Sequence, residues 1–313
     1  MRIAIASGKG GTGKTTIATN LAVILADCGQ NVTYADCDVE APNGHLFLHP
    51  EISRETSVKR LIPTIDDNRC IHCGECGRFC HFGAITCLPN TTLVHPELCH
   101  NCGGCSLICP QKAIQEKGTS GGVVQQGIAD GIIFVSGVFK VGLANSTPVI
   151  RATKNAAGNK GWVLLDAPPG TSCAMIETLK SCDFVILVTE PTPFGLHDLR
   201  LAMEVTGKMN LPFGVVINRN GEGAEIIRKT CVERNIPILA EIPENDAVER
   251  AYSEGKIAVR AIPELRQTFS QIPVQIAEKL ADTNSSYKET RDELFRAMEL
   301  NGQRKKKAEK KSR

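Results

Sequence analysis

Cysteines are concentrated in one short segment of this 313-residue chain. Of its 14 cysteines, nine lie between Cys70 and Cys109. Eight of them form two runs with the same spacing, C-x-x-C-x-x-C-x-x-x-C, which begin 29 residues apart at Cys70 and Cys99. A chain of this length can bury a large core without disulfides, and thiolates spaced so closely are soft metal ligands. The spacing therefore predicts metal binding, and the repeat indicates an internal duplication.

The two runs resemble those of bacterial ferredoxins that hold two [4Fe-4S] clusters. In that family three close cysteines of a run bind one cluster, and the remote fourth binds the other. The resemblance implies one cluster on Cys70, Cys73, Cys76 and Cys109. It implies a second cluster on Cys99, Cys102, Cys105 and Cys80. Zinc is the alternative, because four thiolates also form a tetrahedral site, but three sulfurs so close in sequence do not suit structural zinc.

Two features depart from the ferredoxin pattern. His81 follows Cys80, whereas Pro110 follows Cys109 in the second run. Cys87 lies outside both runs, and we expect it to be a small buried hydrophobic side chain. Neither feature changes the number of ligands that the resemblance implies.

A glycine-rich segment near the N-terminus has the composition of a phosphate site. It consists of Gly8, Lys9, Gly10, Gly11, Thr12, Gly13, Lys14, Thr15 and Thr16. The pattern G-x-x-x-x-G-K-[ST] lies here between an apolar run (3–6) and a helical stretch (14–26), as a phosphate loop requires. Backbone N–H groups would surround the phosphates, Lys14 would reach the β- and γ-phosphates, and Thr15 would bind Mg²⁺. The alternative is a glycine-rich turn without a ligand.

With Lys9 ahead of its paired glycines, the loop resembles the deviant Walker A box of the MinD, ParA and nitrogenase iron protein superfamily. The resemblance implies an ATP-dependent homodimer in which Lys9 reaches the partner's nucleotide. Asp38 matches the switch I aspartate that orients the attacking water. Asp166 matches Walker B and would hold Mg²⁺ through a water. The catalytic residues implied are Lys9, Lys14, Asp38 and Asp166, with ATP and Mg²⁺ as cofactors; the alternatives are a solvated lysine and helix-capping aspartates.

Two further positions match the adenine pocket of that superfamily. Asn218 follows an apolar run and corresponds to the asparagine that contacts adenine. Pro243 begins the segment that closes the adenine and ribose pocket. For Asn218 the alternative is formation of the turn at 218–221.

Apolar runs that alternate with helix-like stretches set the fold class. The predicted strands are 3–6, 31–35, 162–165, 184–189, 213–217 and 238–242. This alternation predicts an α/β fold with a mainly parallel sheet and helices on both faces, with sites at the carboxyl ends of the strands. Together with the resemblance, it predicts a three-layer P-loop NTPase.

The domain organisation follows from where the alternation stops. We expect residues 1–62 and 117–283 to form the ATPase domain. Residues 63–116 would form a small inserted α+β domain of the bacterial ferredoxin type, with 118–122 as a linker. Residues 284–313 would form a C-terminal extension that ends in a disordered basic tail.

Composition and charge narrow the possible partners and location. The last ten residues carry a net charge of +6, which leaves −4 for the rest of the chain, so a nucleic-acid partner is not expected. No apolar run reaches the roughly 18 residues of a membrane span, and the N-terminus does not have the pattern of a leader. We expect a cytoplasmic protein without stable membrane insertion.

Three functions compete for this combination. The leading hypothesis is a slow, partner-stimulated ATPase that couples ATP turnover to electron transfer through two [4Fe-4S] clusters to a redox partner. The alternative is an iron-sulfur assembly or carrier ATPase that passes a cluster to a client protein, although scaffolds of that kind use few, exposed cysteines. A MinD-type positioning ATPase needs a membrane-binding amphipathic helix, and residues 304–313 have charge without an apolar face.

Cys37 and Cys173 lie beside the two expected switch segments. In the nitrogenase iron protein a cysteine after switch II binds a cluster shared by the dimer, which invites comparison with Cys173. That protein uses a second cysteine before Walker B, and this chain has none between Glu116 and Asp166. We expect both Cys37 and Cys173 to be buried apolar cysteines.

Overall fold

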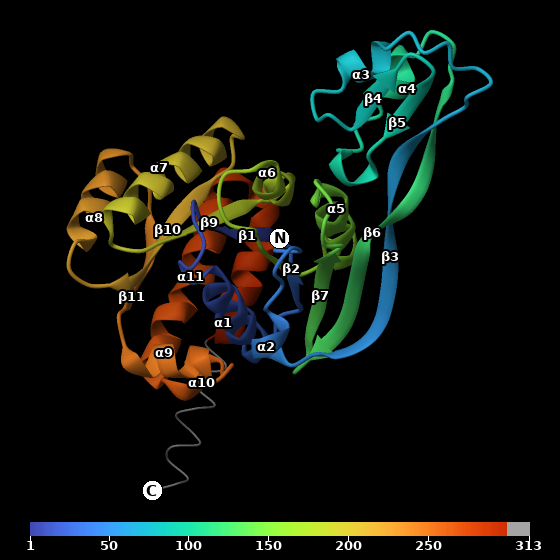
Figure 1. Cartoon of the computed structure of the whole chain (residues 1–313). Coiled ribbons are helices and arrows are strands. Elements are labelled where there is room, and N and C mark those ends of the chain that lie inside the picture. The colour runs from blue at the N-terminus through green and yellow to red at the C-terminus, as the bar shows by residue number, and fades with distance from the viewer. Residues whose placement is uncertain (299–313) are drawn as a thin grey trace, which may run out of the picture.

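A nine-stranded sheet forms the body of the molecule (Figure 1), in the order β11-β10-β9-β1-β8-β2-β7-β6-β3. The computed structural model describes residues 1–298. Seven strands of the sheet are parallel: β1 (Arg2–Ala6), β2 (Val32–Asp36), β7 (Ile132–Phe139), β8 (Trp162–Asp166), β9 (Phe184–Thr189), β10 (Phe213–Asn220) and β11 (Ile238–Pro243). The central strands are continuous apolar runs because helices cover both of their faces.

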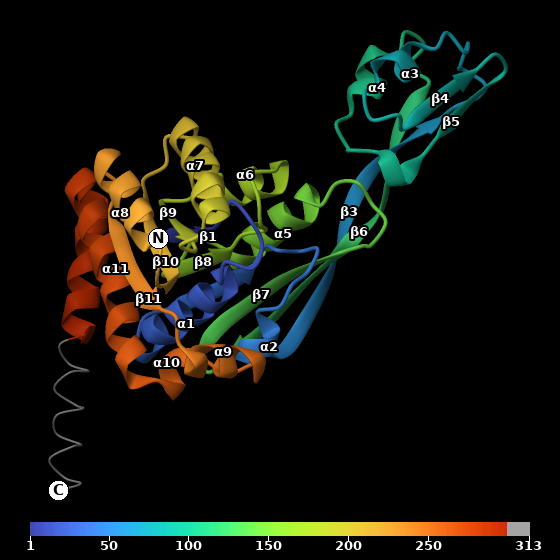
Figure 2. The same cartoon turned by 60° about the vertical axis from the view of Figure 1, so that its left-hand side comes forward.

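Two helical layers enclose the sheet (Figure 2). One face packs against α1 (Lys14–Asp27) and α11 (Pro263–Thr283) in a single apolar core. The other face is covered by four helices: α5 (Thr147–Ala157), α6 (Cys173–Leu179), α7 (Pro193–Lys208) and α8 (Ala224–Glu233). Short helices complete the body: α2 (His45–Leu48), α9 (Asp246–Ser253), α10 (Ala258–Ala261) and η2 (Ser285–Tyr287). The predicted three-layer α/β fold with a mostly parallel sheet is confirmed.

A long antiparallel ribbon leaves one edge of the sheet. It consists of β3 (Glu51–Ile65) and β6 (Ile114–Ala129), which pair from Glu51–Ile128 to Ile65–Ile114. Its tip carries residues 66–113, which we call the lobe and which stand away from the body in both views (Figures 1 and 2). The lobe contains α3 (Glu75–Phe79), β4 (Ile85–Leu88), β5 (Thr91–Val94), η1 (Pro96–Leu98) and α4 (Gly104–Ile108).

The glycine-rich segment 118–122 is part of this ribbon. We expected a linker there, but the segment lies inside β6, where Gly118 pairs with Leu61 and Gly122 pairs with Val58. A Cβ on Gly122 would lie 2.3 Å from the carbonyl oxygen of Val138. Gly122 therefore permits close approach of β6 to its neighbour β7. The expected boundaries of the inserted domain, at residues 63 and 116, fall within β3 and β6.

The first part of the C-terminal extension packs against the body. The Tyr287 hydroxyl donates to Asp183 Oδ1 at 2.8 Å, and Leu294 is fully buried in the core beside α11. The expected basic tail, 304–313, lies outside the described residues. Among residues 1–298, we find no helix whose length and apolar character would let it span a membrane.

Candidate functional site

One cavity at the carboxyl end of β1 gathers most of the predicted nucleotide residues. It contains about 1280 Å³ of empty space. Its lining includes the predicted residues Gly10, Gly11, Gly13, Lys14, Thr15, Thr16, Asp38, Asn218 and Pro243. Asn43, Pro169, Arg219, Asn245, Val248, Glu249 and Tyr252 complete the lining. Gly8 lies directly against α7, where a Cβ on it would lie 2.1 Å from the carbonyl oxygen of Asp198, so only glycine fits at this position of the loop.

The phosphate loop has a backbone that requires glycine. Gly11 and Gly13 have φ angles of 78° and 89°. A Cβ on Gly13 would also lie 2.3 Å from Asn218 Nδ2. The Thr12 hydroxyl oxygen is buried and has no hydrogen-bond partner within residues 1–298. An unsatisfied buried oxygen in a loop of inward-turned backbone fits a site that a polar ligand completes.

Lys14 lines the cavity, and the buried carboxylate of Asp166 acts on its charge from behind the lining. Lys14 is 7% exposed, and burial lowers its pKa, while the carboxylates of Asp166 and Asp38 act in the opposite direction. Asp166 Oδ2 accepts the Tyr34 hydroxyl at 2.9 Å, and Oδ1 has no partner in the described part of the chain. A free carboxylate oxygen near Lys14 and Thr15 fits the outer shell of Mg²⁺, so the residues present suit the ion that the resemblance implies.

Asp36 fixes the loop that follows β2, and Asp38 lies within that loop. Asp36 accepts backbone N–H groups of Asp38 at 3.2 Å, Asn43 at 3.0 Å and Gly44 at 2.9 Å, which fixes the path of this loop. Burial, followed by the charge of Asp166, raises the pKa of Asp36 well above its ordinary value. The same two causes raise the pKa of Asp38 to about 6. The sequence analysis did not identify Asp36 as the residue that holds this loop, although an acidic residue at the end of a strand could have indicated it.

Lys9 and Asn218 make contacts that the resemblance does not describe. Lys9 Nζ lies 3.4 Å from Glu190 Oε2, and the other oxygen of Glu190 lies 2.6 Å from Arg219 Nη1. Asn218 Nδ2 donates to the Thr12 carbonyl at 2.9 Å, which ties β10 to the phosphate loop. Reach across a dimer by Lys9 and adenine contact by Asn218 stay predictions. Glu190 was missed, and its place directly after β9 was the available signal.

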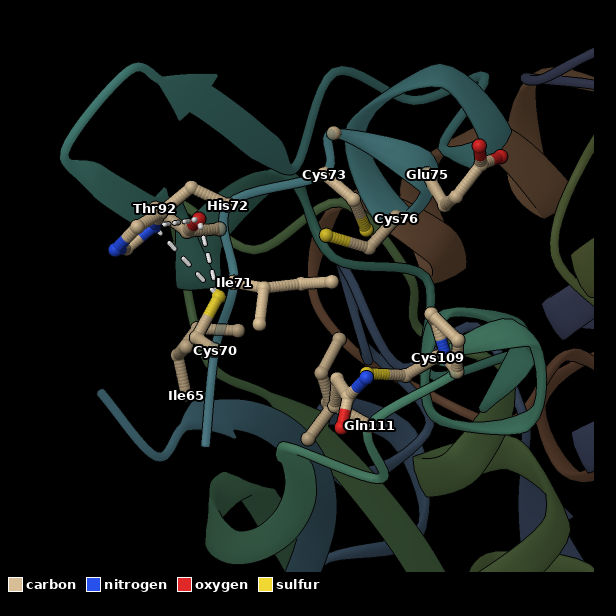
Figure 3. Close-up of a pocket in the computed structure, with 13 residues that line it drawn as sticks. Ile65, Cys70, Ile71, His72, Cys73, Glu75, Cys76, Thr92, Cys109 and Gln111 are labelled. Atoms are coloured by element: carbon tan, nitrogen blue, oxygen red, sulfur yellow. Dashed lines mark hydrogen bonds between the residues drawn. The ribbon is translucent and has the colours of Figure 1, made fainter. Parts of the chain in front are cut away.

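The first crossed set of cysteines lines one cavity in the lobe. Cys70, Cys73, Cys76 and Cys109 surround about 360 Å³ of empty space together with Ile65, Ile71 and Ile114. Figure 3 shows Cys73 and Cys76 on one side of this cavity and Cys70 and Cys109 on others. Three of these cysteines come from the first run, and the fourth comes from the end of the second.

The second crossed set lines another cavity. Cys80, Cys99, Cys102 and Cys105 share about 720 Å³ of empty space with apolar and aromatic side chains. The rings of Phe82 and His100 stack at its wall with centroids 3.7 Å apart. Burial raises the pKa of Cys105 to about 11, so its thiolate needs a strong positive partner.

The spacing of the sulfur atoms bears on which metal group the cavities suit. Within residues 1–298, no group of three or more His, Cys, Asp or Glu side chains is arranged to hold a single metal ion. A [4Fe-4S] cluster binds each thiolate to a different iron atom, so its four sulfurs lie farther apart than the four around one zinc. Each crossed set of four cysteines lines a cavity of its own, an arrangement with the ligand number of a [4Fe-4S] cluster.

Cys37, Cys87 and Cys173, which lie outside the two runs, differ in their exposure to solvent. Cys37 is fully buried, as expected. Cys173 is exposed at the start of α6, so the expectation that it is buried was wrong; α6 is a short helix that begins at the surface after the 167–172 loop. Cys87 is half-buried, with its Sγ 3.6 Å from that of Cys76.

Comparison with known proteins places this geometry in a family. Residues 3–259 match the model of the CobQ/CobB/MinD/ParA nucleotide binding domain. An uncharacterized protein of Methanocaldococcus jannaschii is 35% identical over 224 residues, which cover 71% of this chain and 79% of that protein. An iron-sulfur cluster carrier protein of Pyrococcus abyssi is 24% identical over 310 residues, which cover 92% and 89% of the two chains.

A solved structure supports the same assignment at the level of the fold. The septum site-determining protein MinD of Pyrococcus horikoshii, complexed with Mg-ADP, superposes with a TM-score of 0.56 at 22% identity. The match covers 88% of this chain and 94% of that one. On the family match and this shared fold, the chain belongs to the CobQ/CobB/MinD/ParA family of nucleotide-binding domains.

Proposed function

We propose that this protein is an ATPase that couples ATP binding and hydrolysis to electron transfer through two [4Fe-4S] clusters in the lobe. The observation that carries the proposal is the division of eight cysteines between two cavities in the crossed sets of a two-cluster ferredoxin. When bound, the clusters supply one-electron redox chemistry. We further propose an ATP-dependent homodimer and a redox partner protein.

At the nucleotide site each residue has a stated task. Backbone N–H groups of the loop and the Lys14 ammonium bind the phosphates, and Thr15 and Asp166 are the residues that would hold Mg²⁺. Asp38, from its position on the same cavity, accepts a hydrogen bond from the attacking water and orients it. Lys14 stabilises the charge that develops on the transferred phosphoryl group, and Mg²⁺, when bound, would supply further positive charge there.

A short segment connects this site to the second cysteine cavity. We call residues 139–145 the strap. At one end the Phe139 N–H donates to the carbonyl of Val39, next to Asp38, at 2.8 Å. At the other end Ala144 N–H donates to the Glu97 carbonyl at 2.9 Å, and Asn145 Nδ2 donates to the His100 carbonyl at 2.9 Å. A rearrangement of the segment around Asp38 on nucleotide binding would therefore be transmitted through the strap to the loop around Cys99.

A cluster carrier is the second candidate. Relatives named iron-sulfur cluster carrier proteins match at low identity. Cys73 and Cys102, one from each crossed set, are exposed, which suits transfer to a client. The carrier hypothesis predicts that an apo-ferredoxin gains iron while this protein loses its visible absorbance.

The test is electron paramagnetic resonance of the anaerobically reconstituted, reduced full chain with and without ATP and Mg²⁺. Coupling predicts signals of two [4Fe-4S] clusters whose potential or line shape changes with ATP in the wild type and not in Lys14→Ala. Two clusters that ignore ATP would refute coupling. Transfer of iron without any ATP-linked redox change would favour the carrier.

A further inference from the structure

Arg60 is a buried cation that contacts the backbone of Cys99, one of the cysteines that line the second cavity. It lies in β3 and is 2% exposed. Its Nη2 donates to the carbonyl of Pro96 and, at 3.4 Å, to the carbonyl of Cys99. Gly121 of the paired strand covers its aliphatic stem, since a Cβ there would lie 3.4 Å from Arg60 Cγ. The side chain thus attaches the ribbon to the loop that precedes the second run.

Most of the donor capacity of Arg60 is unused. Both Nε and Nη1 are buried and have no hydrogen-bond partner within residues 1–298. A guanidinium is always charged in proteins, and burying it without a matched anion costs several kcal/mol, on the order of that for any isolated ion. Two backbone carbonyls satisfy only part of this requirement. A group that brings negative charge to Cys99 would supply the rest, and a thiolate-bound cluster is such a group.

Among the described residues, no Lys or Arg lines either cysteine cavity, but Arg60 contacts the backbone of Cys99, which lines the second. Within the first run, Arg78 donates to the Cys73 carbonyl at 3.1 Å. Its side chain is 65% exposed and is paired with Glu75 at 2.5 Å. Solvent and a carboxylate therefore screen the charge of Arg78, whereas the charge of Arg60 acts in a poorly solvated setting.

We propose that Arg60 is a positioning residue that compensates the charge of the second cluster and makes it the higher-potential cluster of the two. The inference rests on the proposed function and adds to it the direction of electron transfer between the two clusters. Reduction adds one electron and no bond, so the cluster becomes more negative by one charge, and a fixed nearby cation stabilises that state. An electron from a low-potential one-electron donor would therefore settle on the cluster of the second crossed set. The strap contacts the residues on either side of Cys99 in that set, at Glu97 and at His100.

The experiment is a redox titration, followed by electron paramagnetic resonance, of the full chain reconstituted with iron and sulfide. Arg60→Gln keeps a donor and removes the charge, so one midpoint potential falls and the other stays. Arg60→Lys keeps the charge and stays close to the wild type. Arg78→Gln is the matched control and moves neither potential. Cys102→Ser and Cys73→Ser assign each signal to its cavity.

Several outcomes would overturn the inference. Unchanged potentials in Arg60→Gln with both clusters present would do so, as would an equal shift in Arg78→Gln. If Arg60→Gln does not assemble the second cluster, Arg60→Lys decides: a second cluster that Arg60→Lys retains supports charge compensation, and a second cluster that neither variant assembles rejects it. Absence of clusters from the wild type, by iron and acid-labile sulfide analysis, would instead reject the proposed function.

Discussion

The Lys9 ammonium lies 3.4 Å from the Glu190 carboxylate of its own chain. The side chain of Lys9 is 31% exposed and that of Glu190 is 12% exposed, and Glu190 also binds Arg219. A lysine that is to reach a partner's nucleotide must first leave this pair. In the proposed ATP-dependent dimer, this ion pair would oppose the reach of Lys9 until ATP offers a competing anion.

Removing the Glu190 carboxylate should ease dimerisation. We expect Glu190→Gln to lower the protein concentration needed for the ATP-bound dimer about thirtyfold, because a symmetric dimer breaks two such partly exposed ion pairs, each worth about 1 kcal/mol. Sedimentation velocity with ATP and Mg²⁺ measures this shift. Glu204→Gln, which breaks an exposed pair with Lys208 on α7, is the control and leaves dimerisation unchanged. Equal dimerisation of Glu190→Gln and wild type would show that the pair does not restrain Lys9.

Asp38 should impose an acid limit on activity. Its pKa is raised to about 6 by burial and by Asp166, so below that pH it is protonated and no longer accepts a hydrogen bond from the attacking water. We expect kcat/KM for ATP, which reports the free enzyme, to fall with a one-proton slope below about pH 6. Asp38→Asn should lose roughly 10²- to 10⁴-fold in rate and lack this limb. A wild-type profile that stays flat to pH 5 would contradict the assignment.

The raised pKa of Asp38 should also make the free energy of unfolding depend on pH. The folded state holds the Asp38 proton up to a pKa of about 6 and the unfolded state only to about 3.8, so the free energy of unfolding falls as pH rises through this window. Asp38→Asn should therefore melt at a higher temperature than wild type at pH 7 and at a similar temperature near pH 4. The exposed Asp282→Asn, at the end of α11, serves as control. A melting difference independent of pH would reject this cause.

The contrast between the sheet and the ribbon explains how much of the fold the sequence could predict. β1 and β9 are buried apolar runs, and their residue types alone predict them. β3 is exposed over most of its length and has no such pattern; backbone pairing with β6 defines it. Tyr34 and Arg60 act only through partners far along the chain, so no local spacing could identify them, whereas Glu190 follows β9 directly and its position was a usable signal. The glycine loop and the two cysteine runs are local patterns, so they could be predicted.

Exposure of Cys173 should be visible in its reactivity. We expect a maleimide to label Cys173 rapidly in the native chain and to leave Cys37 unlabelled, because Cys37 is fully buried and burial raises its pKa well above the ordinary value. Peptide mass spectrometry after brief labelling measures both sites. Cys173→Ala removes the fast site and should leave Cys37 protected. Rapid labelling of Cys37 in that variant would contradict the packing described for the segment after β2.

Breaking the strap should separate ATP hydrolysis from its effect on the clusters. Asn145 Nδ2 donates to the His100 carbonyl, and its Oδ1 accepts the Thr147 N–H at 3.1 Å at the start of α5. Asn145→Asp keeps the acceptor and removes the donor, so α5 stays capped while the contact with the Cys99 loop is lost at a cost of about 1 kcal/mol. We expect basal ATPase activity close to that of wild type and a smaller ATP-induced change in the signal of the second cluster. Asn155→Asp, at the far end of α5, is the control. A full ATP response in Asn145→Asp would mean that the switch acts on the lobe through β3 and β6 rather than through the strap.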